Sequence, residues 1–192
     1  MITLHEEPLS MLVEHGSVPI RFAVRRVLEV CAVDGGFGGM TLTERAVDEP
    51  WIKDYNEIER PERWAARFNV SRWGLIAARD DGARIGGAVI AFGADDVMML
   101  EGRTDLAVLW DLRVAPEHRG RGVGGLLFRA VERWAAERGC RWLKVETQNI
   151  NVDACRFYAR RGCTLGGINR FAYPDLPDEA QLLWYRDLHA ER

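Results

Sequence analysis

A run rich in glycine and arginine, Arg119-Gly120-Arg121-Gly122-Val123-Gly124-Gly125, lies between an expected strand at 106–114 and an expected helix at 124–138. Glycines lack the Cβ atom that would keep backbone N–H groups away from a ligand. A helix N-terminus directs those N–H groups, with about half a positive charge, toward one point. The guanidinium groups of Arg119 and Arg121 add charges that can fork onto phosphate oxygens. We therefore interpret this run as a pyrophosphate-binding loop.

The glycine spacing admits more than one phosphate ligand. Gly120, Gly122 and Gly125 spell GxGxxG, and Glu146 follows about twenty residues later, as in dinucleotide-binding folds. Three features argue against a nicotinamide or flavin cofactor. Residues 115–119 separate the strand from the first glycine, too little chain follows for the rest of that fold, and two arginines stand where a neutral turn would serve. A Walker P-loop is excluded because no Gly-Lys-Ser/Thr follows.

A second segment with a chemical pattern begins about thirty residues downstream of the loop. It reads Asn151-Val-Asp-Ala-Cys-Arg-Phe-Tyr-Ala-Arg-Arg-Gly162. Together with Arg119-x-x-Gly122-x-Gly124, preceded by Val114-Ala115-Pro116, this segment resembles the GNAT acetyltransferase superfamily. The resemblance implies direct transfer of an acetyl group from acetyl-CoA to an amine, without a metal.

A narrower resemblance is to the streptothricin acetyltransferases. It is carried by Glu146 to Tyr158, by Glu49 to Tyr55, and by a C-terminal group: Gly166, Ile168, Tyr173, Pro177, Trp184 and Tyr185. One departure is Trp110, where a second carboxylate beside Asp111 is expected. The resemblance implies a small cationic amine as acceptor, such as a streptothricin-type antibiotic. The alternatives are another small amine, a protein amine, or a non-catalytic CoA-binding regulatory module.

The resemblance also assigns roles to single residues. Tyr158 is the expected general acid that protonates the leaving thiolate, because its phenol is a neutral donor at pH 7; its other reading is a core aromatic. Asn151 is expected to bond the cofactor arm or an ordered water, and asparagine also serves well as a helix N-cap. Leu112, Arg113 and Val114 are expected to bind the cofactor, with Leu112 and Val114 offering backbone groups to pantetheine.

The amine also needs a base, since an alkyl amine with a pKa of about 10 is almost wholly protonated at neutral pH. The candidates are Asp111 and Glu146, each on an apolar strand. A carboxylate there is costly to bury unpaired, so each is either functional or paired with an arginine such as Arg113. Cys155 lies in the first turn of a helix, but the reaction needs no thiol, and we expect a small packed residue.

The order of elements predicts the fold. Strands are expected at 19–33, 40–47, 73–79, 84–92, 106–114, 142–147, 163–171 and 181–188, and helical segments at 50–55, 61–68, 124–138 and 151–161. We predict an α/β (α+β) fold: one domain over 1–192, with a mixed sheet of about six to seven strands and flanking helices. By resemblance, strands 106–114 and 142–147 splay apart. Residues 1–16 are polar and aperiodic, and we expect a loose N-terminal arm.

Composition limits the remaining possibilities. With 26 basic and 29 acidic residues the net charge is −3, which gives no general affinity for nucleic acid. The four cysteines have no CxxC spacing and the four histidines no HxxxH pair, so no metal site is expected. No apolar run reaches the about 18 residues of a membrane span. No signal pattern opens the chain, and we expect a cytoplasmic protein. The resemblance allows a homodimer, but the sequence does not decide it.

Overall fold

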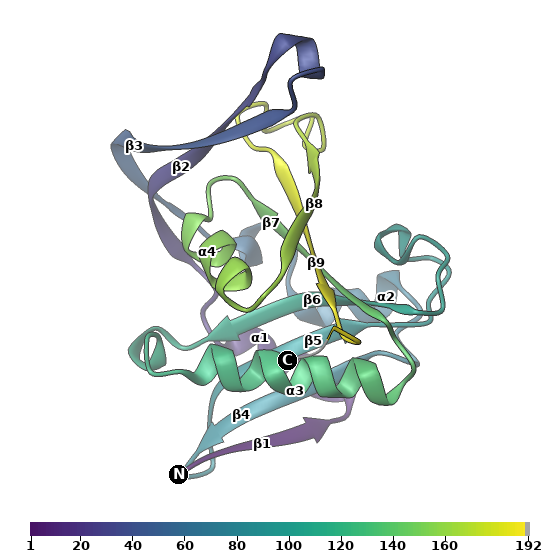
Figure 1. Ribbon diagram of the computed structural model, residues 1–192. Coiled ribbons are helices and arrows are strands. Elements are labelled where there is room, and N and C mark those ends of the chain that lie inside the picture. The colour runs from purple at the N-terminus through teal and green to yellow at the C-terminus, as the bar shows by residue number, and fades with distance from the viewer. Residues whose placement is uncertain (191–192) are drawn as a thin grey trace. The chain divides into compact units, whose positions relative to one another are not determined.

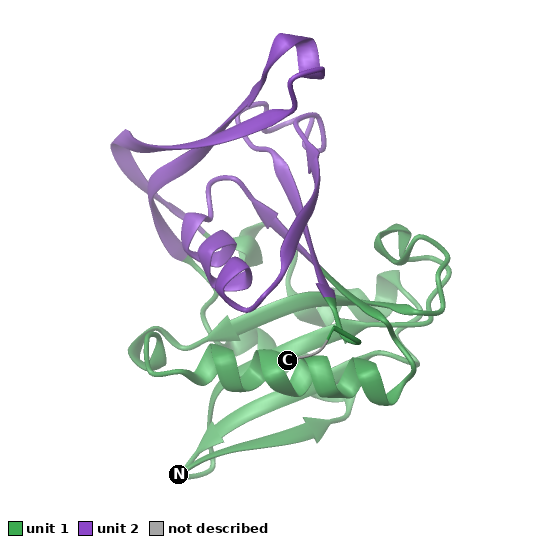
Figure 2. Cartoon of the chain, in the orientation of Figure 1, with its two compact units in different colours: residues 1–21, 54–144, 187–192 green, residues 22–53, 145–186 purple. Residues whose placement is uncertain are grey.

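The computed structural model describes residues 1–190, which divide into two compact units (Figure 2). Unit 1 comprises Met1–Arg21, Asp54–Lys144 and the described residues 187–190. Unit 2 comprises Phe22–Lys53 and Val145–Arg186. Each unit therefore joins segments that are distant in the sequence, and each is described separately below.

Unit 1 is built on antiparallel strands in the order β1-β4-β5-β6 (Figure 1). These strands are β1 (Ile2–Glu7), β4 (Gly74–Asp80), β5 (Ala83–Ala91) and β6 (Leu106–Val114). The helices of the unit are α1 (Leu12–Ser17), α2 (Trp64–Arg67) and α3 (Val123–Glu137). Short 3-10 turns lie at Leu9–Met11, Tyr55–Glu57, Pro61–Arg63, Met98–Leu100 and Pro116–His118.

The two faces of this sheet are covered differently. Helix α3 runs across β4, β5 and β6 (Figure 1) and buries Leu127, Val131 and Trp134. Gly74 is required there, since a Cβ on it would lie 2.5 Å from the Trp134 ring. The next residue, Leu75, points to the other face, as strand alternation demands, and belongs to a buried cluster that includes Leu12 of α1. The sheet of unit 1 is thus sandwiched between α3 and the α1 side.

Unit 2 holds the remaining elements. A two-stranded antiparallel sheet consists of β2 (Phe22–Ala32) and β3 (Met40–Lys53), joined by the 3-10 turn Asp34–Gly36. Helix α4 (Val152–Arg160) follows β7 (Trp142–Gln148), whose first residues belong to unit 1. Strands β8 (Thr164–Asn169) and β9 (Gln181–Asp187) pair antiparallel.

The larger sheet has seven strands in the order β1-β4-β5-β6-β7-β9-β8. The predicted mixed α/β fold with six to seven strands and flanking helices is therefore confirmed. The elements from β4 to β9 lie within about two residues of their predicted bounds, because their apolar periodicity and the glycines after α3 and α4 mark them locally. No helix among residues 1–190 is long and apolar enough to cross a bilayer.

The predicted loose arm at residues 1–16 is wrong. Strand β1 pairs with β4 from Ile2 opposite Asp80 to Glu7 opposite Leu75. Glu7 forms ion pairs with Arg79 and Arg84, and the 3-10 turn Leu9–Met11 then leads into α1. The polar residues that made this segment look unstructured are partnered across an edge strand, where charged side chains are common. Sequence composition cannot reveal such partners.

The short helix predicted at 50–55 is also wrong. Strand β3 continues through Pro50 to Lys53, and only Tyr55–Glu57 forms a 3-10 turn. Pro50 cannot donate a ladder hydrogen bond, but a two-stranded sheet consists of edge strands, where proline is tolerated.

Candidate active site

The loop 119–125 opens at the N-terminus of α3. Gly120 and Gly122 have φ angles of 74° and 86°, in the left-handed region that favours glycine. No heavy atom lies within 4 Å of a Cβ built on either glycine, so the space beside the backbone is open. Gly122 is the N-cap of α3, and no side chain caps the first turn. The first N–H groups of a helix lack intrahelical partners, so this loop suits a diphosphate.

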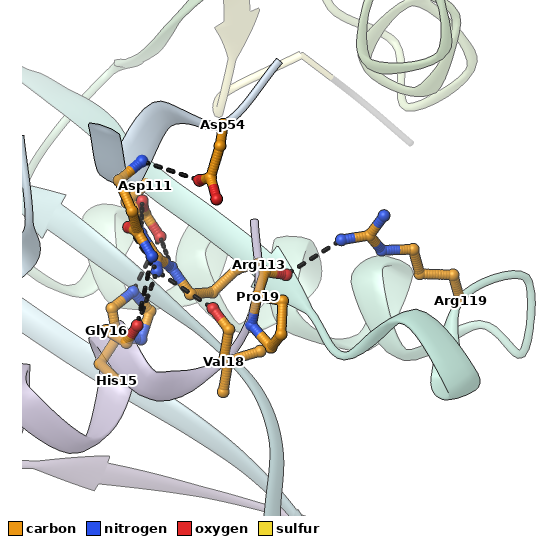
Figure 3. Close-up of polar contacts among 9 residues, drawn as sticks. His15, Gly16, Val18, Pro19, Asp54, Asp111, Arg113 and Arg119 are labelled. Carbon is orange, nitrogen blue, oxygen red and sulfur yellow. Dashed lines mark hydrogen bonds and ion pairs between the residues drawn. The ribbon is translucent and has the colours of Figure 1, made fainter. Parts of the chain in front are cut away.

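The two arginines of this loop differ. The Arg119 guanidinium donates through Nη2 to the Pro19 carbonyl at 3.0 Å (Figure 3), through Nη1 to the Arg21 carbonyl at 3.0 Å and through Nε to the Val114 carbonyl at 2.9 Å. Three of the five N–H groups of Arg119 therefore have backbone partners within the protein. Arg121 is exposed and has no hydrogen-bond partner within residues 1–190, so its charge remains available to a ligand.

Strand β6 contains a bulge at Trp110. Opposite β5, Ile90 pairs with Leu109 and Val89 with Asp111, which leaves Trp110 as the extra residue. A bulge lets two consecutive side chains reach one face. Trp110 packs against the cluster that contains Leu12 of α1, and Asp111 bonds to His15 of the same helix. The bulge therefore places Trp110, which stands where a second carboxylate is expected, beside the carboxylate of Asp111.

Asp111 is buried and fully partnered. Its Oδ1 accepts Arg113 Nε and His15 Nε2, both at 2.8 Å, and its Oδ2 accepts Arg113 Nη2 at 2.6 Å (Figure 3). Burial alone would raise the pKa of Asp111, but the charge of Arg113 and the hydrogen bonds from Arg113 and His15 outweigh it and hold the pKa well below its usual range. The expected pairing with Arg113 is confirmed, and a carboxylate held this way is a poor general base.

The same geometry limits what Arg113, expected among the cofactor-binding residues, can offer to a cofactor. Its side chain is buried, and Nη1 donates to the Val18 carbonyl at 3.1 Å and to Asn56 Oδ1 at 3.2 Å. The guanidinium therefore faces the protein interior, and only the backbone of Arg113 remains for a cofactor. The side chains of Leu112 and Val114 alternate to the α3 face and are partly exposed. Their backbone role toward pantetheine stays a prediction.

Trp110 closes an aromatic cluster in unit 1. Its ring centroid lies 5.2 Å from Phe68, 5.2 Å from Trp73 and 6.3 Å from Trp64. Trp64 and Trp73 are buried. These rings pack as core.

Glu146 differs from Asp111 in its partners. It lies on β7 within unit 2, half-buried, where Oε1 accepts the Tyr173 hydroxyl at 2.5 Å and Oε2 accepts Gln181 Nε2 at 2.8 Å. Both donors are neutral, and no ion pair to Glu146 forms within the described chain. The neighbouring Thr147 bonds to Cys155 of α4, so alternation directs Glu146 to the face away from α4.

Helix α4 carries the remaining predicted residues. Asn151 caps it, its side chain accepting the N–H of Ala154 at 3.2 Å, so the N-cap role is confirmed. Tyr158 is buried, with its ring edge-on to Phe157 at 5.1 Å. Cys155 is buried, and burial raises its pKa to about 11. Cys155 is therefore the packed residue that was expected, while the catalytic role of Tyr158 stays a prediction.

Sequence reasoning missed several partners. His15 and Asn56 hold the Asp111–Arg113 pair, and Gln181 holds Glu146. Tyr173 entered only as part of a resemblance. No periodicity or spacing marks these residues, because each lies far along the chain from the group it contacts.

Comparison with known families decides between the phosphate ligands. The sequence profile of the acetyltransferase (GNAT) family matches residues 41–163. The chain belongs to this family. GNAT enzymes use acetyl-CoA, so the dinucleotide alternative is set aside, and the protein is an acetyl-CoA-dependent N-acetyltransferase.

The curated relatives include streptothricin acetyltransferases. One from Escherichia coli is 31% identical over 167 residues, covering 85% of this chain and 84% of the relative. One from Streptomyces lavendulae is 27% identical, covering 87% of this chain and 84% of the relative. Similarity thus extends over most of both chains and is not confined to the loop.

Solved structures agree on the fold. A nourseothricin acetyltransferase is 26% identical with a TM-score of 0.77, covering 97% of this chain and 98% of that chain. A GNAT acetyltransferase from Elizabethkingia anophelis, solved with acetyl-CoA bound, is 15% identical with a TM-score of 0.56, covering 97% of both chains. The second likeness concerns the fold alone.

Proposed function

We propose that this N-acetyltransferase transfers acetyl from acetyl-CoA to an amino group of a streptothricin-type antibiotic. The observation that carries the proposal is the 31% identity to a streptothricin acetyltransferase over 85% of this chain. The family profile includes segments of both units. We therefore propose that units 1 and 2 belong to one acetyltransferase domain.

In this proposal Glu146 receives the acceptor amine. Within residues 1–190 its carboxylate accepts hydrogen bonds from two neutral groups, those of Tyr173 and Gln181. Each oxygen retains a lone pair, and a half-buried carboxylate without a cationic partner attracts an ammonium group. Glu146 then takes the proton that the amine must lose before it attacks the thioester. Asp111 does not compete, because Arg113 and His15 already occupy both of its oxygens.

Loop 119–125 holds the pyrophosphate through backbone N–H groups, with Arg121 adding charge. The amine nitrogen attacks the acetyl carbonyl, the C–S bond breaks, and the thiolate leaves. Tyr158 donates its phenolic proton to that thiolate. Asn151 fixes the first turn of α4 and with it the orientation of the helix that carries Tyr158.

A thiol-release assay tests the acceptor. The wild-type enzyme is supplied with acetyl-CoA and a panel consisting of streptothricin, an aminoglycoside, simple diamines and a peptide with an N-terminal alanine. We expect kcat/KM to be highest for streptothricin by at least about 100-fold, a difference of about 3 kcal/mol in transition-state binding. Fastest turnover of the alanine peptide would instead favour a protein acceptor, like that named for a Bacillus subtilis relative, a ribosomal protein bS18-alanine N-acetyltransferase 31% identical over 70% of this chain.

A further inference from the structure

Arg119 opens the proposed pyrophosphate loop, but its side chain is turned toward the protein. Its three nitrogens donate to three backbone carbonyls, those of Val114, Pro19 and Arg21, at 2.9 to 3.0 Å. Figure 3 shows the bond to Pro19. The first carbonyl ends β6, and the other two belong to the segment 18–21. This segment follows α1, so Arg119 ties the start of the loop to a part of the chain about 100 residues earlier.

The segment 18–21 has no helix or strand of its own, so its carbonyls need partners from elsewhere. Arg113 supplies one at its start, donating to the Val18 carbonyl at 3.1 Å. Arg119 supplies two further along. Arg113 is itself held by Asp111, which His15 also contacts from α1. The guanidinium groups of Arg113 on β6 and of Arg119 in the loop therefore both donate hydrogen bonds to the segment 18–21.

The glycines of loop 119–125 do not by themselves hold its backbone in one conformation. Gly120 and Gly122 allow the backbone wide conformational freedom, and nothing lies within 4 Å of a Cβ on either. A planar guanidinium that bonds three fixed carbonyls sets position more strictly than a flexible ammonium could. The geometry thus favours a structural use of Arg119 over a phosphate contact.

We propose that Arg119 is a positioning residue, which fixes the pyrophosphate loop through the segment 18–21, and that Arg113 anchors the other end of that segment. Arg119 does not bind phosphate directly, and Arg121 supplies the charge. This inference rests on the proposed role of loop 119–125 in binding acetyl-CoA.

Paired substitutions by Lys and Gln separate the contribution of an arginine's charge from that of its several hydrogen bonds. Arg119→Lys keeps the charge but loses the three-carbonyl fork, whereas Arg119→Gln loses both. We expect each to weaken CoA binding, measured by calorimetry, by about tenfold, as for loss of hydrogen bonds to a charged group. Arg121→Lys should stay within about twofold of wild type, and Arg121→Gln should weaken binding, as for loss of a direct charge contact. Arg133→Lys, at an exposed position further along α3, is the matched control.

S-acetylpantetheine serves as a second acetyl donor that lacks the pyrophosphate. General disruption of the enzyme would lower kcat/KM with this donor, whereas misplacement of the pyrophosphate loop alone would not. We expect kcat/KM with this donor to be unchanged in both Arg119 variants. An Arg119→Lys enzyme that binds CoA as wild type does, while Arg119→Gln does not, would overturn the proposal in favour of a direct phosphate contact. Equal losses with both donors would overturn it in favour of general disruption.

A second variant tests the segment itself. Pro19→Gly keeps the carbonyl that Arg119 contacts and frees an exposed backbone position. We expect weaker CoA binding, and no further loss when Pro19→Gly is combined with Arg119→Gln, because both break one connection. Additive losses would contradict the connection. If wild-type enzyme binds CoA no more tightly than pantetheine, the loop assignment itself fails, which is distinguishable from all these outcomes.

Discussion

The sharpest test of the pyrophosphate loop is a pair of substitutions at Gly122. This residue has φ 86° and is the N-cap of α3. Asn and Asp are the side chains that best tolerate the left-handed region after glycine, so both variants bear a similar strain of about 1 kcal/mol. A side chain here enters open space, since no atom lies within 4 Å of the Cβ position. The Gly122→Asp and Gly122→Asn enzymes thus differ mainly in one negative charge.

That charge lies where the diphosphate is expected. At a separation of about 5 Å and an effective dielectric constant of about 40, two unit charges repel by about 1.7 kcal/mol. Repulsion from two phosphates then reaches about 3 kcal/mol, which corresponds to about a 100-fold weaker affinity. We expect Gly122→Asp to bind CoA about 100-fold more weakly than Gly122→Asn at low salt, and the difference to shrink as salt screens it.

Isothermal calorimetry with CoA measures both affinities, and thermal unfolding provides the control. A carboxylate at a helix N-terminus is stabilising by about 0.3–1 kcal/mol, so Gly122→Asp should melt no lower than Gly122→Asn. Weaker binding of the aspartate variant then cannot come from unfolding. Equal CoA affinities of the two variants would refute the placement of pyrophosphate at this helix start.

Four further predictions concern groups outside the loop. Tyr158→Phe should lower kcat by about 100-fold with an unchanged Kd for CoA, as for loss of a general acid; normal turnover would remove Tyr158 from the mechanism. Glu146→Gln should lower kcat/KM for the acceptor and leave CoA binding unchanged, and an unaltered acceptor profile would exclude Glu146. The depressed pKa of Asp111 contributes stability that is present above its unfolded pKa of about 3.9 and lost as pH falls through its folded pKa. Asp111→Asn should therefore lower the free energy of unfolding at pH 7 by about 3–5 kcal/mol, by leaving a buried guanidinium unpaired; urea titrations from pH 7 to 3 should show this deficit narrowing only in acid. Cys31 is exposed and Cys155 is a buried thiol with a pKa of about 11, so a thiol reagent at pH 8 should modify Cys31 first, and rapid labelling of Cys155 would show that α4 opens readily.

Much of the fold could be predicted because its signals are local. The hairpin of β4 and β5, the strand β6 and the helices α3 and α4 each have apolar periodicity and glycine stops within one continuous stretch. Strand β1 could not be predicted, because Glu7 is stabilised by Arg79 and Arg84, which belong to other strands. Cross-strand ion pairs leave no trace in the composition of the edge strand that they hold.

The candidate site likewise has some features that follow from neighbouring residues in the sequence and others that depend on distant contacts. The sequence by itself determined the glycine loop and the Asn151 cap, because a helix N-terminus and its capping residue are neighbours along the chain. Only the tertiary structure decided what the charged residues do. The carboxylate of Asp111 is hydrogen-bonded to a histidine 96 residues away, and the guanidinium of Arg119 is hydrogen-bonded to carbonyls about 100 residues away.

A charged side chain keeps its charge wherever it is placed, but its chemistry depends on which partners the fold brings within hydrogen-bonding distance. The sequence could therefore name two carboxylates and two loop arginines as candidates without ranking them. In the structure the carboxylate of Asp111 and the guanidinium of Arg119 are already bonded within the protein. Within residues 1–190 Glu146 accepts from neutral donors, and Arg121 has no hydrogen-bond partner.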